Sequence, residues 1–209
     1  MKQATFPESH PRAGFRIRRS LYSCAVALFL ASSPRADAAD ARFGGGMGAH
    51  FQYADMESGA GRLKGLAWGL GGILHYRFGN HFRVGSMGST WHLSYSTPGL
   101  AGSYQDFGYG GLTAEFCLRV KTGWAAIGIM AGGGRGTNLN VRSRAPGDSI
   151  TARYSSFSAM VAAPTLSYEH SLTKVISVLV LVDYLIAIHD GSVQPLGSPG
   201  LRLGFVFGR

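Results

Sequence analysis

The feature that most constrains this chain is an alternation of apolar residues with small or polar ones, repeated along much of its length. Between residues 65 and 78 the alternation is unbroken. One set of positions is glycine-rich and includes His75 and Arg77, and the other set is Leu66, Trp68, Leu70, Gly72, Leu74, Tyr76 and Phe78. Successive side chains of a β-strand point to opposite faces, whereas a helix repeats every 3.6 residues. The segment therefore predicts a strand with one apolar face.

The same period of two recurs in eight segments, and an even number of strands suits a closed antiparallel sheet. The eight segments are 43–53, 65–78, 82–95, 104–120, 124–134, 152–169, 175–188 and 200–207. The alternation changes phase near Gly85-Ser86 and at Gly110-Gly111, which predicts β-bulges at both places. With these bulges, the apolar face includes Met87, Trp91, Leu93, Tyr95, Phe107 and Tyr109.

The connections between these segments alternate between long and short. The long ones are 55–64, 97–103, 135–150 and 189–199, and the short ones are 79–81, 121–123 and 170–174. This rhythm is typical of transmembrane barrels with long extracellular loops and tight periplasmic turns. The segments are 8 to 18 residues long, and most of them are long enough to cross a bilayer as tilted strands. The sequence therefore predicts an all-β fold, an eight-stranded antiparallel up-and-down transmembrane β-barrel.

Composition separates this prediction from a soluble barrel of the lipocalin type. Charged residues make up only 15% of the 209 residues, although 45% are hydrophobic and 31 are glycine. Soluble domains usually contain about 25% charged residues. A soluble barrel would bury its apolar face, but here the opposite face carries Gly, Ser, His and Arg, and aromatic residues gather near the strand ends, as they do at membrane interfaces. An inside-out barrel is therefore favoured over a soluble one.

Residues 1–38 have the pattern of a secretory signal peptide. Arg12, Arg16 and nearby basic residues form the amino-terminal region, residues 21–30 are apolar, and Ala36-Asp37-Ala38 offers a cleavage site. A mitochondrial presequence is the alternative. Cleavage would leave a barrel of residues 39–209 and lower the formal net charge from +9 to +5, which removes the support for a nucleic-acid partner. Only Cys117 would remain, so no internal disulfide is expected.

The chain resembles the small eight-stranded bacterial outer-membrane proteins, the group of OmpW, OmpX and the OmpA membrane domain. The resemblance covers 42–207 through the pattern of alternation and loop lengths. Such proteins end in an assembly signal of a polar residue, Gly two positions on, and apolar residues, and residues 198–205 (SPGLRLGF) fit it. The chain departs from the family by continuing to Arg209 instead of ending at an aromatic residue. The resemblance implies location in the bacterial outer membrane, contact with its lipids and recognition by the barrel-assembly machinery.

The lumen of such a barrel would receive the face opposite the apolar one. We expect it to be lined by His50, His75, Arg77, His92, Glu115, Arg119, Glu169, Leu179, Leu181, Asp183, Leu185 and Arg202, with Cys117, Ile73 and Val206 also pointing inward. An eight-stranded barrel is just wide enough for side chains to fill it. Paired charges would close the lumen as a plug, whereas the three leucines on one strand would form an apolar wall. The first hypothesis is a narrow channel or binding site for small hydrophobic molecules; the alternative is a structural or adhesive surface barrel with a plugged lumen.

The predicted loop 135–150 holds a local basic cluster. Arg135, Arg142 and Arg144 face one acidic residue, Asp148, and Arg153 follows just beyond. Arginine forks bind phosphate and other anions well. The interpretation is either a solvated loop or an extracellular site for anionic surface ligands.

Catalytic and metal sites are not expected, and neither is a cofactor. No His/Cys pair has metal-ligand spacing on one strand. His92-Leu93-Ser94 puts a histidine and a serine on one face of a strand, and Asp106 follows on the next, a spacing similar to that of outer-membrane lipid A deacylases. This chain has Asp where those enzymes have Glu and Tyr95 where they have Asn. Because His-x-Ser is common by chance, we expect no enzyme and keep a lipid hydrolase as a minor alternative.

Overall fold

The computed structural model describes residues 43–58, 61–97, 100–144, 150–188 and 198–208. The predicted signal peptide lies outside these residues and stays a prediction, as does the interior of the predicted loop 189–199. No helix among the described residues is long and apolar enough to cross a membrane.

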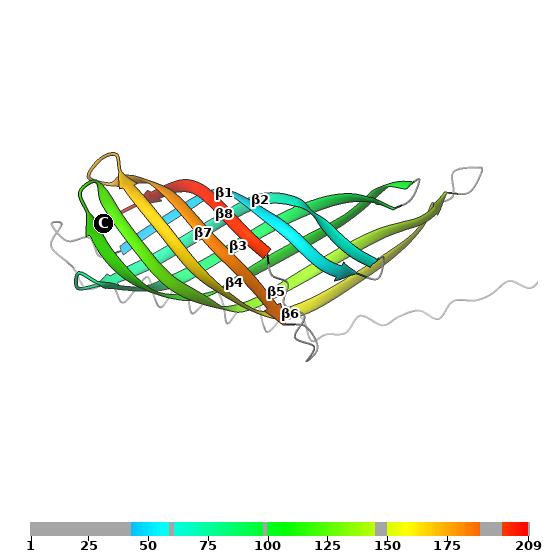
Figure 1. The fold of residues 1–209 in the computed structure, drawn as a ribbon, viewed down its shortest axis with the longest axis horizontal. Coiled ribbons are helices and arrows are strands. Elements are labelled where there is room, and N and C mark those ends of the chain that lie inside the picture. Colours follow the sequence, from blue (N-terminus) through cyan, green and yellow to red (C-terminus); the bar gives the residue numbers. More distant parts are fainter. Residues whose placement is uncertain (1–42, 59–60, 98–99, 145–149, 189–197, 209) are drawn as a thin grey trace, which may run out of the picture. The chain divides into compact units, whose positions relative to one another are not determined.

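Eight antiparallel strands form one closed barrel, which confirms the predicted fold (Figure 1). Each strand pairs with its neighbours in the chain, and β1 closes the ring by pairing with β8. The strands are β1 (Phe43–Ser58), β2 (Gly61–Phe78), β3 (Phe82–Thr97), β4 (Leu100–Val120), β5 (Gly123–Arg144), β6 (Ile150–Ser171), β7 (Ile176–Ile188) and β8 (Ser198–Phe207).

The seam between the first and last strands depends on glycine. Gly48 of β1 pairs with Gly204 of β8, and a Cβ on Gly48 would lie 2.3 Å from the carbonyl oxygen of Leu203. Any larger residue at Gly48 would therefore force the two backbones apart. The strand number is even, so the start of β1 and the end of β8 lie together at the end with the short turns, as the pairing of Gly45 with Phe207 shows.

The two faces of the sheet are sorted as an inside-out barrel requires. Outward side chains are large and apolar: Leu70 is 71% exposed and Leu112 is 76% exposed. Inward side chains include fully buried charges, among them Arg83 and Arg202, as well as buried leucines. An apolar band of this kind would be unstable in water and is stable in lipid. The protein is therefore an integral membrane barrel.

The strands are longer than predicted, and this corrects the loop boundaries. β5 continues to Arg144 and β6 begins at Ile150, so Arg135, Arg142 and Arg144 lie on a strand and not in the predicted loop 135–150. The predicted loops 55–64 and 97–103 are likewise mostly strand. The sequence signal ends early because strands that extend beyond the bilayer need no apolar face; only their backbone pairing continues.

The predicted phase of β3 and of the first half of β4 is also wrong. Met87, Trp91 and Leu93 of β3 and Phe107 and Tyr109 of β4 are buried inside the barrel. In both strands the alternation of inward and outward side chains continues unchanged past Gly85-Ser86 and Gly110-Gly111, where bulges were predicted. The register shifts of the described sheet lie instead at Tyr95/Thr97 and Val141/Ser143. Periodicity alone could not show this, because the upper lumen is itself filled with apolar and aromatic side chains.

Candidate functional site

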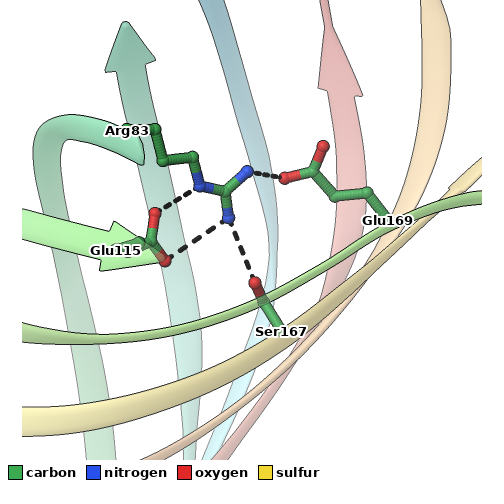
Figure 2. Close-up of polar contacts among 4 residues, drawn as sticks. All are labelled: Arg83, Glu115, Ser167 and Glu169. Carbon is green, nitrogen blue, oxygen red and sulfur yellow. Dashed lines mark hydrogen bonds and ion pairs between the residues drawn. The ribbon is translucent and has the colours of Figure 1, made fainter. Parts of the chain in front are cut away.

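The lumen near the short turns is crossed by a cluster of ionic hydrogen bonds centred on Arg83 (Figure 2). From β3, the Nε of Arg83 donates to Oε2 of Glu115 on β4 at 2.5 Å, and Nη1 donates to Oε1 of Glu169 on β6. Nη2 donates to Oε1 of Glu115 at 3.3 Å and to Oγ of Ser167 at 3.1 Å. Since β3 and β6 are three strands apart in a ring of eight, this cluster spans the bore.

The three charged side chains of this cluster are buried, so each depends on the others for its stability. The side chain of Arg83 is 1% exposed and those of Glu115 and Glu169 are 2% and 6% exposed. Three charges at this depth are stable only together, because each one alone would lose its hydration without compensation. Gly128 of β5 lies beside the cluster, where a Cβ would come within 2.4 Å of the Cγ of Glu115. The glycine therefore leaves the space that Glu115 needs.

A second polar layer crosses the lumen further from the turns. Arg202 of β8 reaches across the bore, where it donates to Oγ of Ser89 on β3 and, at 3.2 Å, to the carbonyl oxygen of Gly72 on β2. A Cβ on Gly71 would lie 2.6 Å from Nε of Arg202. The side chain of Arg202 can therefore cross at this point only because residue 71 is glycine. Arg202 is fully buried.

His50, Tyr109 and Asp183 form a third polar group. The Tyr109 hydroxyl donates to Oδ2 of Asp183 at 3.4 Å, and Nε2 of His50 lies 3.9 Å from the same oxygen. The His50 and Tyr109 rings meet edge to face with their centroids 6.1 Å apart. These residues come from β1, β4 and β7, so they tie three parts of the wall together.

Apolar side chains fill the rest of the bore. Leu179 and Leu181 of β7 are 0% exposed and Leu185 is 2% exposed. They belong to one buried cluster with Ile73, Met87, Met130, Val206 and the rings of Trp91, Phe107 and Tyr109. The predicted leucine wall therefore exists, but side chains from the other strands pack against it.

The structure puts most of the predicted lumen residues inside the barrel. His50, His75, Glu115, Cys117, Glu169, Leu179, Leu181, Asp183, Leu185 and Arg202 are buried. Arg77 and Arg119 lie near the turn end: Arg77 is half-buried with its guanidinium 3.9 Å from the ring of Trp124, and Arg119 is exposed. The prediction for His92 is wrong, because the inward positions of β3 are the odd-numbered ones and His92 is on the outer face.

Sequence reasoning missed Arg83, the residue that organises the closed end. A signal for Arg83 was present at the start of β3 alone: the apolar residues Phe82 and Val84 flank Arg83, and with both of them outward Arg83 points inside. Gln52, Gln105 and Asn138 were also missed; Asn138 donates to Oε1 of Gln105 at 3.0 Å within the barrel. In the described part of the chain, no group of three or more His, Cys, Asp or Glu side chains could hold a metal ion.

Comparison with known proteins supports the architecture. No protein-family model matches the sequence, and no curated protein matches it significantly. Two solved structures of Ail, the attachment invasion locus protein of Yersinia pestis, superimpose with TM-scores of 0.51 and 0.50 at 15% identity; the first covers 81% of this chain and 99% of Ail, the second 80% and 97%. The outer-membrane protein OprG of Pseudomonas aeruginosa gives a TM-score of 0.51 at 12% identity over 80% of this chain and 95% of OprG. The chain thus has the fold of the small eight-stranded outer-membrane β-barrel proteins.

Proposed function

We propose that this protein is a closed outer-membrane barrel that acts at the cell surface, where its long β5–β6 hairpin binds polyanionic ligands. The proposal rests on the Arg83 cluster, whose buried ion pairs cross the bore near the short turns (Figure 2). A barrel with its lumen occupied in this way acts through its outer surfaces.

The β5–β6 hairpin has the longest strands of the barrel, with 22 residues in each. Strand β7 pairs with β6 only from Met160 to Ser171, so residues 150–159 of β6 have described partners on β5 alone. The extended part carries Arg142 and Arg153, which are exposed and lie on adjacent strands within two register positions. The one described carboxylate of these two strands is Glu169, buried at the opposite end.

An excess of arginine on an exposed hairpin attracts sulfated or phosphorylated polymers, because guanidinium groups bind such anions with paired hydrogen bonds. One of the structures with the same fold is Ail in complex with the heparin analogue sucrose octasulfate. That complex supports the proposal that a barrel of this kind can bind a polysulfate.

We expect the purified protein in detergent to bind immobilised heparin and to be eluted by salt, because the attraction between exposed charges is screened. Replacing both Arg142 and Arg153 by Ser should lower the affinity at least about 10-fold, through the loss of two charge-assisted contacts. The matched control replaces Arg119, exposed at the turn end, by Ser and should bind as the wild type does. Equal binding by all three proteins would contradict the proposed hairpin site.

The second candidate function is passage of small hydrophobic molecules along the wall of Leu179, Leu181 and Leu185. The observation in its favour is that these leucines share one strand with one inward face. Passage of a molecule along this wall requires the side chains packed against the leucines to move aside. Liposomes that contain the protein should then take up a hydrophobic probe faster than empty liposomes, and Leu181→Arg should abolish the difference. Uptake equal to that of empty liposomes would exclude this candidate and leave the closed barrel.

A further inference from the structure

Three side chains near the outer rim form a hydrogen-bonded relay that the closed lumen does not use. On β3, Nε2 of His92 lies 2.9 Å from Oγ of Ser94, two residues along the same face. Nδ1 of the same ring lies 2.6 Å from Oδ1 of Asp106, which is the register partner of His92 on β4. The His92 ring also packs against Tyr104, with ring centroids 5.5 Å apart. Serine, histidine and aspartate thus follow one another at hydrogen-bond distance.

This relay is on the outer face of the barrel and is accessible. The side chains of His92 and Asp106 are 42% and 49% exposed, and Ser94 is exposed. Tyr95, the next residue, points inward and donates to Oδ1 of Asn138 at 2.9 Å, so it does not cover the relay. On the other side, His92 pairs with Trp68 of β2, which is 65% exposed on the same face.

The height of the relay along β3 corresponds to the lipid–water boundary. Phe82 is the first residue of β3 after the periplasmic turn, and His92 follows ten residues later. At about 3.3 Å per residue and a tilt of about 40°, this separation is a rise of roughly 25 Å, the height of the apolar band of an outer-membrane barrel. The relay therefore faces the level at which the ester bonds of outer-leaflet lipids lie.

Below the relay, the outer face has unusually small side chains. The register pair that lies two positions nearer the membrane centre is Thr90 and Gly108. The next outward pair is Gly88 and Gly110. Packing constrains these glycines less than those of the seam: a Cβ would lie 3.4 Å from its nearest neighbour at Gly108, 3.1 Å at Gly88 and 3.3 Å at Gly110, which is tight but needs only a small shift, unlike the 2.3 Å at the seam residue Gly48. The exposed Leu70 of β2 pairs with Thr90 and borders this strip. On the other side the strip is bordered by Arg135, the exposed register partner of Gly108 on β5. The strip of small residues therefore leads from the relay toward the membrane interior as a shallow depression between Leu70 and Arg135.

We propose that Ser94, His92 and Asp106 form a serine esterase site that hydrolyses an ester-linked acyl chain of an outer-leaflet lipid. The acyl chain lies in the depression formed by Thr90, Gly108, Gly88 and Gly110, which brings its ester carbonyl to Ser94. Hydrogen bonding to Asp106 holds the His92 ring with Nδ1 protonated and Nε2 free to accept the serine proton.

The reaction balances without any cofactor. Oγ of Ser94 attacks the ester carbonyl carbon while Nε2 of His92 takes the hydroxyl proton. The tetrahedral intermediate breaks its bond to the alcohol oxygen, which receives that proton from His92 and leaves as the deacylated lipid. A water molecule then attacks the acyl-serine and gives a proton to His92; the bond to Oγ breaks, Oγ takes the proton back, and the fatty acid is released.

The test uses two readouts on the folded protein in detergent: covalent labelling by a fluorophosphonate, and release of fatty acid from a phospholipid in mixed micelles. Wild type should be labelled at Ser94 and should release fatty acid. Ser94→Ala should lose the label, and fatty-acid release should fall at least about 100-fold. Asp106→Asn should slow both readouts without preventing folding, as judged by heat-modifiable migration. Ser96→Ala, a change two residues further along the same face, is the matched control and should behave as wild type.

The depression is tested by substrate length. Gly108→Leu fills it and should reduce the turnover of a long-chain p-nitrophenyl ester at least about 10-fold relative to that of the butyrate ester. The control is Ala162→Leu on β6, which pairs with Ala131 and Ile186 away from the depression and should leave the ratio unchanged. The absence of labelling and hydrolysis in folded wild type, or labelling that survives Ser94→Ala, would overturn the esterase site. Both readouts are independent of heparin binding, so a failure here leaves the proposed hairpin function untouched.

Discussion

Replacing Arg83 by Met should lower the free energy of unfolding by about 3–5 kcal/mol, because the change leaves two buried carboxylates without their cation. Glu115 and Glu169 would then face each other across the bore, and neither is exposed enough to be hydrated. Methionine keeps the unbranched stem of arginine and therefore part of its packing, so the unpaired carboxylates account for most of the effect. Urea titration of the barrel in detergent micelles, followed by tryptophan fluorescence, measures the change.

Two controls separate the charge effect from general damage. The triple variant Arg83→Met/Glu115→Gln/Glu169→Gln removes all three charges and should recover much of the lost stability, since a neutral interior has no unpaired ion. Arg142→Met, an exposed arginine of the extended hairpin, should change the stability by less than about 0.5 kcal/mol. If Arg83→Met were as stable as wild type, the ionic cluster would not be what holds the closed end together.

Replacing the outward-facing Leu112 by Arg should destabilise the barrel in a bilayer by about 2–4 kcal/mol, the cost of a cation near the membrane midplane. Leu112 is 76% exposed and lies six residues before Leu118, a rise of about 15 Å on a tilted strand. In water the same change at so exposed a position would alter stability by only about 0.5 kcal/mol.

The matched control for Leu112 is Thr151→Arg on β6, where the strand extends beyond its pairing with β7 and the residue is exposed. It should leave the stability of the barrel in lipid vesicles close to that of wild type, because the cation stays in water. Equal small effects at both positions would mean that the apolar belt does not face lipid.

The sequence predicted the fold well because a lipid-facing surface imposes a simple rule on alternate residues. On β7, the outward Val178, Val180 and Val182 alternate with the inward Leu179 and Leu181, and the structure keeps that phase. The same rule predicted the outward faces of β1, β2, β5, β6 and β8. The number of strands and their antiparallel order followed from the segments and their connections.

The rule failed where the lumen is as apolar as the membrane. On β3 and β4, Trp91 and Phe107 pack inside with their ring centroids 5.6 Å apart, and residue type alone does not distinguish a lumenal aromatic ring from a lipid-facing one. Because the predicted phase of β3 was wrong, His92 was assigned to the lumen and Arg83 was not. The strand ends were missed for a different reason, because residues such as Arg142 and Arg153 extend above the bilayer, where no alternation is required.

The closed lumen is tested most directly by the current through single barrels in a planar lipid bilayer. Folded wild-type protein, inserted at a density shown by its heat-modifiable band, should give no discrete openings, because the Arg83 cluster crosses the bore and buried apolar side chains pack inside it. Stepwise, reproducible openings from the folded wild type would show that the bore conducts, and would contradict the account of this protein as a sealed barrel.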